Sequence, residues 1–334
     1  MKAAVRDRYG PVDVVEVRDI ERPSPGGDEV LVRVEAASVN RADLDGLTPK
    51  PSFVRLFLGL RAPRNRRLGC DVAGVVEAVG ADVTRFRPGD RVFSDLYPFG
   101  GGAFAEAVCA PERAFAPVPE AMSLETAATL PHSGILALQG LRLRSGRSVG
   151  PGDRVLIVGA SGNVGPFAVQ IAKSHGAEVT GVSSTEKLDF VRSLGADHVV
   201  DYTTTDYLTT GERYDWILDV EARHPLLRSR RALGPKGVYV TLGGTNVTLL
   251  DAMLVGTVIS LATDKTTGLM LWWRPFAAED VATLTELVAA GKVNPRIDRR
   301  FPLGEIVEAL RYVDEGRAKG KVIVLPPAAA GSDA

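Results

Sequence analysis

Hydrophobic and polar positions follow two different patterns on either side of residue 123. Before it, short β-branched segments such as 29–39 and 70–80 lie between clusters of Gly, Pro and Asp. Pro88 and Gly89 form a strong turn signal, because proline presets φ and glycine accepts positive φ. Many short strands between turns predict a barrel-like or sandwich-like β domain in this part of the chain.

Strands and helices alternate from residue 153 to about residue 262. Ser123 is a typical helix N-cap, and Pro131 interrupts the helical spacing that follows. Apolar strand segments then alternate with helical segments, which indicates βαβ units and predicts a parallel sheet. A last helix is expected over 277–291. The predicted fold class is therefore α/β, with a second, β-rich part.

Composition and charge exclude several classes of protein. The 334-residue chain has a formal net charge of -1, so no global attraction to nucleic acid is expected. The two cysteines, Cys70 and Cys109, allow one disulfide at most, and we expect none in a cytosolic enzyme. No apolar run reaches the roughly 18 residues of a membrane span, and Met1 leads into no apolar signal core. We therefore expect a cytoplasmic protein with no membrane segment.

A glycine-rich turn is the clearest functional motif. Gly159, Gly162 and Gly165 follow a predicted buried strand at three-residue spacing, and a helix is expected to follow them up to Gly176. Such glycines let the backbone approach a ligand and let the helix pack on the strand, so that free N–H groups face an anion. Packing alone could also require this turn. Because a second βα unit follows, the context predicts dinucleotide binding.

The end of the next strand indicates which dinucleotide binds. An NAD site usually has Asp or Glu there to accept from the ribose 2′-hydroxyl, but this strand ends in Ser183 and Ser184. Lys187 adds a positive charge, and the nearby Glu186 weakens that argument. Serine hydroxyls and an ammonium suit a 2′-phosphate, so the sequence favours NADPH. The alternative is that these residues only cap the next helix.

The chain resembles the medium-chain dehydrogenase/reductase superfamily, and within it the zinc-free quinone oxidoreductase (zeta-crystallin-like) branch. The segments that carry the resemblance are "GASGNVGPFAVQIAKSHGAEVTGV", "VRSLGADHVVDY", "FRPGDRVF", "VNRADLDG" and "GRAKGKVIV". It runs from Met1 to about Leu325. It implies a GroES-like catalytic domain formed by residues 1–122 and 268–334, and a Rossmann domain with a doubly wound parallel sheet over 123–267.

The resemblance also implies site residues. Counterparts of Ser183, Lys187 and Tyr202 hold the adenosine 2′-phosphate in similar proteins. Further cofactor-binding residues expected on the same grounds are Asn40, Ser161, Gly162, Asn163, Val164, Leu242, Gly243 and Lys321. In similar proteins the strands that close the Rossmann sheet pair across a dimer. The apolar segment 255–263 suits that role, so we expect a homodimer.

A catalytic zinc ion is not expected. Zinc-bearing relatives have a cysteine where this chain has Asn40, and a four-cysteine lobe that is absent here. Cys70 and His132 nevertheless fall at or near the other two ligand positions, and Asp71 is an available carboxylate. Cys70 as a small buried residue and His132 as part of a pocket wall are the simpler interpretation. No metal ligand is therefore predicted.

Three functions remain open on these residues. The favoured one is reduction of the activated double bond of an enone, enoyl or quinone substrate by NADPH, with hydrogen bonds to the developing enolate. The alternatives are a carbonyl reductase or alcohol dehydrogenase, with or without an irregular zinc site, and a non-catalytic NADPH-binding protein. Candidate catalytic residues are Asn40, Asp71, Tyr97 and His132. The basic segment 48–67 replaces a tyrosine-bearing stretch of similar reductases and is expected to shape the substrate entrance.

Overall fold

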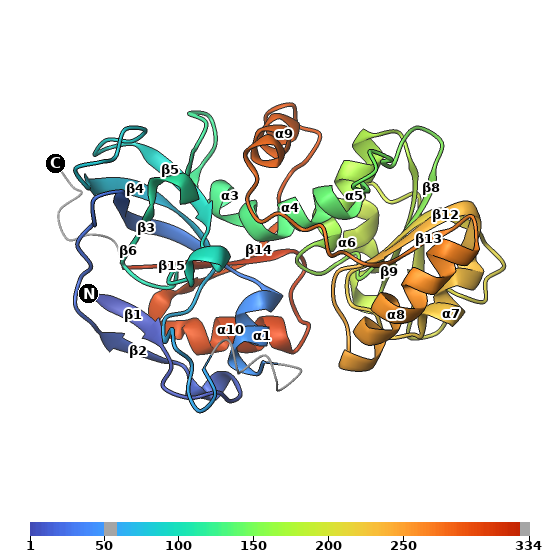
Figure 1. Ribbon diagram of the computed structural model, residues 1–334, viewed down its shortest axis with the longest axis horizontal. Coiled ribbons are helices and arrows are strands. Elements are labelled where there is room, and N and C mark those ends of the chain that lie inside the picture. Colours follow the sequence, from blue (N-terminus) through green and yellow to red (C-terminus); the bar gives the residue numbers. More distant parts are fainter. Residues whose placement is uncertain (50–58, 328–334) are drawn as a thin grey trace. The chain divides into compact units, whose positions relative to one another are not determined.

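The computed structural model describes residues 1–49 and 59–327 (Figure 1). The described chain divides into two compact units. Unit 1 comprises Met1–His132, Pro275–Thr285 and Ile297 onward, and unit 2 comprises Ser133–Arg274 and Glu286–Arg296. Part of the segment expected to shape a substrate entrance, residues 50–58, lies outside the described residues, as do residues 328–334 at the C-terminus.

Unit 1 is built on a seven-stranded sheet in which β15 joins the C-terminal part of the chain to the N-terminal part. β15 pairs antiparallel with β3 on one side and parallel with β14 on the other. A separate antiparallel pair, β1 and β2, completes the strands. Their bounds are β1 (Lys2–Val5), β2 (Glu16–Asp19), β3 (Glu29–Val39), β4 (Asp71–Val79), β5 (Arg91–Asp95), β6 (Ala107–Pro111), β7 (Ala116–Pro117), β14 (Ile297–Pro302) and β15 (Lys321–Leu325).

The helices of unit 1 start where the sequence places caps and turns. Ser123 accepts a hydrogen bond from the backbone N–H of Thr126 at 3.1 Å, which confirms it as the N-cap. Helix α3, which follows this cap, contacts β3 and β4, whereas the domain limit expected after residue 122 assigned it to the other domain. The helices are α1 (Arg41–Leu47), α3 (Leu124–Thr129), α9 (Ala278–Ala289), which extends into unit 2, and α10 (Ile306–Asp314).

Unit 2 contains a six-stranded parallel sheet in the order β10-β9-β8-β11-β12-β13. After β10 the chain returns to the middle of the sheet and adds β11, β12 and β13 on the other side of β8. This strand order is that of a doubly wound Rossmann fold and confirms the predicted fold class. The strands are β8 (Arg154–Val158), β9 (Glu178–Ser183), β10 (His198–Asp201), β11 (Tyr214–Asp219), β12 (Leu233–Thr241) and β13 (Thr266–Leu269).

Helices cover both faces of this sheet (Figure 1). Helices α5 and α6 lie against β8, β9 and β10, while α8 contacts β13 and α7. The bounds are α4 (Pro131–Gly140), α5 (Gly165–Ser174), α6 (Leu188–Ser193), α7 (Leu226–Ser229) and α8 (Asn246–Ala262). Short 3-10 turns of the two units are Val12–Val14, Tyr97–Phe99, Glu112–Ala114, Thr185–Lys187, Arg230–Ala232 and Leu303–Glu305.

The expectation of a strand over residues 255–263 is wrong. These residues form the second half of helix α8, and the strand that closes the sheet is the shorter β13. The segment contains many β-branched residues, but the helix continues through them from an N-cap at Thr245, which accepts a hydrogen bond from the N–H of Thr248. Tertiary contact with β13 therefore outweighs the local β preference.

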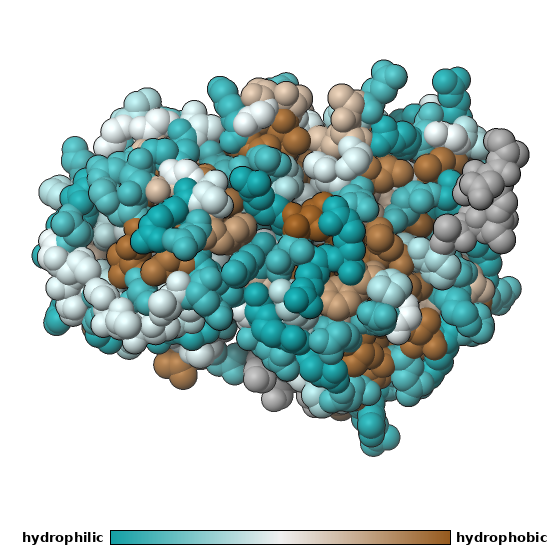
Figure 2. Space-filling model, turned by 180° about the vertical axis from the view of Figure 1, so that it is seen from behind, coloured by the Kyte–Doolittle hydropathy of each residue, from teal (hydrophilic) through white to brown (hydrophobic). Residues whose placement is uncertain are grey.

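The tryptophan-rich run after β13 is anchored within unit 2. The Gln139 side chain donates to the carbonyl of Arg274 and accepts from its N–H, both at 2.9 Å. The indole N–H of Trp272 donates to the carbonyl of Gln139. On the side of the molecule shown in Figure 2 the surface is mostly hydrophilic, with small scattered hydrophobic groups. No helix among the described residues is long and apolar enough to cross a membrane.

Candidate active site

A buried polar cluster lies where β3, β4, β5 and β15 of unit 1 meet. It brings together five residues that the sequence singled out, and all five belong to unit 1: Asn40, Asp71, Tyr97, His132 and Lys321. It also contains Ser38, Asp43, Cys70 and Asp95. All members except Tyr97, which is exposed, are buried. Since buried polar groups require partners, the hydrogen bonds of this cluster define what each residue can do.

Asp71 is the centre of the cluster. One carboxylate oxygen, Oδ2, accepts from the Ser38 hydroxyl at 2.9 Å, the Asn40 amide at 2.8 Å and the Lys321 ammonium at 3.2 Å. The other oxygen accepts from the backbone N–H of His132 at 2.9 Å. Burial raises the pKa of Asp71, and the positive charge of Lys321 opposes that rise. Four donors leave little capacity for substrate, so this geometry favours an anchoring role for Asp71.

Asn40 and Lys321 are connected to each other as well as to Asp71. The Lys321 ammonium donates to the Asn40 side-chain oxygen at 2.6 Å. The Asn40 backbone N–H donates to Asp43 at 2.8 Å, which holds the first turn of α1. The family resemblance implies that Asn40 and Lys321 bind the cofactor, and the structure adds that they brace the same buried carboxylate.

His132 stands at the start of α4, where Pro131 begins the helix, and its imidazole meets Asp95. The distance from His132 Nδ1 to Asp95 Oδ2 is 2.9 Å, and both side chains are buried. The other oxygen of Asp95 accepts from the backbone N–H of Tyr97 at 2.9 Å. The ring of Tyr97 lies 5.7 Å, centroid to centroid, from that of His132. Tyr97 thus stands beside the imidazole, as its selection as a candidate requires.

The environment of His132 favours the protonated imidazole. Burial alone lowers the pKa of a histidine, because it disfavours the charged form. The negative charge of Asp95 and its hydrogen bond act in the opposite direction, with help from Asp71, and the net result is a raised pKa for His132. A histidine in this state can donate a proton near neutral pH.

Asp95 is the functional candidate that sequence reasoning missed. It is the last residue of β5, in the segment "RVFSDLY", two residues before Tyr97. A carboxylate at the end of a buried strand was the available signal. Its partner His132 lies 37 positions further along the chain, so no local spacing connects them.

The residues at the zinc-ligand positions do not fit a metal site. Burial, followed by the charge of Asp43, raises the pKa of the Cys70 thiol well above its usual value. The thiol is hydrogen-bonded to Asp43, His132 Nδ1 is paired with Asp95, and Asp71 has four donors. Among residues 1–49 and 59–327 no three His, Cys, Asp or Glu side chains are placed to hold a metal ion.

The predicted glycine turn lies between β8 and α5 in unit 2, as expected. Gly159 has φ +84°, and a Cβ on Gly165 would stand 2.3 Å from the carbonyl oxygen of Gly159. A side chain at residue 165 would therefore push the helix off the strand. A Cβ on Gly162 would meet no atom closer than 3.6 Å, so this backbone is open to a ligand. Ser161, Asn163 and Val164 complete the turn.

The other expected cofactor residues follow the carboxyl ends of neighbouring strands. Ser183 ends β9, and its hydroxyl donates to that of Ser161 at 2.7 Å. The N–H of Tyr202, just after β10, donates to the Ser183 carbonyl. Leu242 and Gly243 follow β12, and the Leu242 N–H donates to the carbonyl of Asp219 at the end of β11. Ligands of open parallel sheets bind at this edge.

Two positively charged side chains lie near the ends of β9 and β10. Lys187 is buried at the end of the turn Thr185–Lys187. The guanidinium of Arg223, which sequence reasoning did not select, lies 6.0 Å from the ring centroid of Tyr202. Two cations in this part of unit 2 suit a phosphate group. Asp201, at the end of β10, accepts hydrogen bonds from Thr185 and Thr203.

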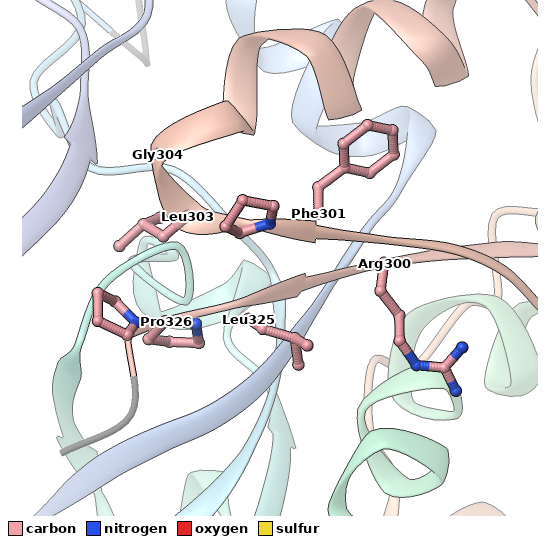
Figure 3. Close-up of a pocket in the computed structure, with 8 residues that line it drawn as sticks. Arg300, Phe301, Leu303, Gly304, Leu325 and Pro326 are labelled. Atoms are coloured by element: carbon pink, nitrogen blue, oxygen red, sulfur yellow. The ribbon is translucent and has the colours of Figure 1, made fainter.

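A separate pocket of unit 1 lies at the ends of β14 and β15 (Figure 3). It is lined mainly by apolar residues, among them Leu303, Leu325 and Pro326. The only charged lining residue, Arg300, extends away from Leu303 and Pro326 and pairs with Glu125 at 2.7 Å. Because this pocket contains none of the cluster residues, it is not the candidate active site.

Comparisons with known proteins identify the family of the chain. A family model described as an alcohol dehydrogenase GroES-like domain matches residues 26–120, and one described as a zinc-binding dehydrogenase matches residues 194–324. The chain belongs to the quinone oxidoreductase branch of the medium-chain dehydrogenase/reductase superfamily, whose members are oxidoreductases that use a nicotinamide cofactor. The predicted resemblance is therefore confirmed.

Three similar proteins illustrate the range of this branch. The chloroplastic quinone-oxidoreductase QR1 of Triphysaria versicolor is 33% identical, over 98% of each chain. The 2-methylene-furan-3-one reductase of Solanum lycopersicum is 30% identical, over 98% of this chain and 79% of its own. The quinone oxidoreductase of Coxiella burnetii has a solved structure that is 30% identical, with a TM-score of 0.84 over 97% of this chain and 99% of its own. A cytoplasmic location stays a prediction.

Proposed function

We propose that this protein is an NADPH-dependent reductase of activated carbon–carbon double bonds, acting on an enone, enoyl or quinone substrate without a metal ion. The substrate class follows the relatives, which include quinone oxidoreductases and a methylene-furanone reductase. The observation that carries the cofactor assignment is the end of β9, where Ser183 stands in place of the carboxylate of an NAD site.

The residues of unit 2 suit the phosphates of the cofactor. The open backbone at Gly162 and the N-terminal end of α5 offer N–H groups to the pyrophosphate. Ser183, Lys187 and Tyr202 are the residues proposed to bind the 2′-phosphate. When bound, NADPH supplies the hydride, so the protein has to bind, orient and supply a proton.

His132 is the residue of unit 1 best suited to supply that proton. Histidine ordinarily titrates near neutrality, and the surroundings of His132 raise the pKa of its imidazole. Asp71 is occupied by four donors, and the Cys70 thiol is held protonated by burial. We therefore assign general-acid donation to His132, with Tyr97 as its neighbour.

A substrate panel tests the proposed function. The purified protein is expected to oxidise NADPH in the presence of a quinone and of an α,β-unsaturated ketone, and to leave a saturated alcohol with NADP⁺ unchanged. Activity should survive dialysis against a metal chelator. Turnover of the alcohol that a chelator abolishes would instead support the alcohol dehydrogenase alternative. Tight NADPH binding without turnover of any substrate would support a non-catalytic role.

A further inference from the structure

We propose that Asp95 is a positioning residue that holds His132 ready to donate its proton from Nε2. The inference rests on the proposed function and adds a residue that neither the sequence motifs nor the relatives point to. Its basis is the buried pair formed by the two side chains, with 2.9 Å between Asp95 Oδ2 and His132 Nδ1.

The carboxylate of Asp95 is fixed by the backbone. Its Oδ1 accepts from the N–H of Tyr97 at 2.9 Å, in the tight turn that follows β5. The backbone of His132 is also held, because its N–H donates to Asp71 at 2.9 Å. Both members of the pair are therefore held in place by groups that do not themselves react, which is what a preorganised proton donor requires.

The pair determines which ring nitrogen exchanges protons. A carboxylate can only accept, so Nδ1 carries its hydrogen toward Asp95 in every protonation state, and exchange falls to Nε2. During turnover the Nε2–H bond breaks and an O–H bond forms on the enolate or hydroquinone anion that hydride addition creates. The neutral imidazole then regains its proton from water. Asp95 takes no part in the proton transfer itself and only orients the imidazole.

The rest of the cluster does not need this pair for its own hydrogen bonding. Ser38, Asn40 and Lys321 are satisfied by Asp71, and Asp43 by Asn40 and Cys70. Burying an imidazole and a carboxylate together is costly compared with apolar side chains of similar volume. A buried pair that carries this cost, and that the other polar groups of the cluster do not need for their own hydrogen bonds, is better explained by chemistry than by stability.

Asp95→Asn tests the assignment, because asparagine has the same shape but no charge. Asp298→Asn is the matched control. Like Asp95, Asp298 accepts from one aromatic side chain and one backbone N–H, here the Tyr312 hydroxyl and the N–H of Lys319, but it lies outside the cluster. We expect kcat to fall about 10²-fold or more in Asp95→Asn, as for loss of general-acid help, with NADPH affinity unchanged. Asp95→Glu should restore part of the activity.

The pH profile separates positioning from a structural effect. Charged groups facing His132 are Asp95 on β5, Asp71 on β4, Lys321 on β15 and Asp43 on α1. The donor is the protonated imidazole, so kcat of the wild type falls as pH rises through the raised pKa of His132. Without the Asp95 charge burial lowers that pKa, and the fall should move to lower pH. Asp298→Asn should keep the wild-type profile.

Nuclear magnetic resonance of ¹⁵N-labelled histidine detects the hydrogen bond between His132 and Asp95 without any measurement of turnover. The chain has four histidines, and His132→Gln identifies the signal of this one. A downfield Nδ1–H resonance is expected in the wild type and should be lost in Asp95→Asn, while far-ultraviolet circular dichroism shows whether the variant is folded. If Asp95→Asn does not fold, Asp95→Ser, which also removes the carboxylate, carries the same comparison.

Two results would overturn the assignment. One is wild-type kcat in folded Asp95→Asn. The other is a lowered kcat with an unshifted pH profile and an unchanged His132 resonance, which would make Asp95 structural only. A wild type that reduces no quinone or enone would overturn the proposed function instead, and the resonance would still show whether the pair exists.

Discussion

At the scale of single residues, hydrogen-bonding capacity separates groups that brace the site from groups that can react. Asp71 and Lys321 both carry charge, yet each is committed to partners inside the cluster. His132 differs because Asp95, which pairs with its Nδ1, raises the pKa of the imidazole against the effect of burial. In unit 2, β9 ends in Ser183 and not in a carboxylate. Ser183 and Lys187 can therefore offer a hydroxyl and an ammonium to a phosphate group without a carboxylate at that strand end to repel it.

Lys187→Ala tests the 2′-phosphate assignment at this scale. Loss of one charge-assisted contact should weaken NADPH binding by about 1.5–3 kcal/mol and change NADH binding little, because NADH has no 2′-phosphate. The measurement is calorimetric titration of each cofactor. Lys292→Ala, which removes an exposed lysine of the same unit, is the control. Equal affinities of the wild type for NADPH and NADH would contradict the assignment.

At the scale of elements, the glycine turn between β8 and α5 shows how a helix terminus is placed for an anion. The helix packs on β8 and β9 only because residue 165 has no side chain facing the Gly159 carbonyl. Pro166 occupies the first turn, where its missing N–H has no helical partner to lose. The phosphate site and the helix–strand packing thus depend on the same backbone.

Gly165→Ala should therefore impair stability and cofactor binding together. The added Cβ would overlap the Gly159 carbonyl and the Ala160 backbone, which has no flexible end to move aside. Overpacking of this kind typically destabilises by about 1–3 kcal/mol. Denaturant unfolding and NADPH titration measure the two effects. Gly304→Ala, where no atom lies within 4 Å of the added Cβ, should change neither. A fully stable Gly165→Ala with normal affinity would refute this dependence.

At the scale of the whole molecule, helix α8 leaves an uncharged apolar stripe on the surface. Val247, Leu250, Leu254, Val258 and Leu261 follow one another at spacings of three and four, and each is 57–84% exposed. The one charged residue of α8, Asp251, accepts from the backbone N–H of Leu226. A stripe without Lys or Arg does not suit an anionic membrane, and two copies can pair through it without burying charge.

We therefore expect a homodimer that uses α8, in place of the strand pairing expected from the sequence. Replacing both Leu254 and Val258 by Glu should convert it to a monomer, because paired carboxylates would repel across the interface. Light scattering at micromolar concentration measures the mass. Leu60→Glu changes another exposed leucine and should leave the dimer intact. A monomeric wild type would rule the expectation out.

Local signals in the sequence were sufficient to determine the parts of this protein that depend on neighbouring residues. The turn at Gly89, the cap at Ser123, the break at Pro131 and the βαβ alternation each rest on backbone preferences that act over a few positions. The glycine turn and Ser183 at the end of β9 follow from the same alternation, because parallel strands end at one edge.

Only the tertiary structure determined which charged groups meet. Asp71 and Lys321 are 250 positions apart, and Asp95 and His132 are 37 positions apart. The spacing of these residues along the chain therefore does not indicate that either pair is in contact. The same holds for α8, where β-branched residues favour a strand locally but contacts with β13 keep the segment helical. Pairing of buried charges and packing of an element on its neighbours depend on distances in space, which the order of residues does not contain.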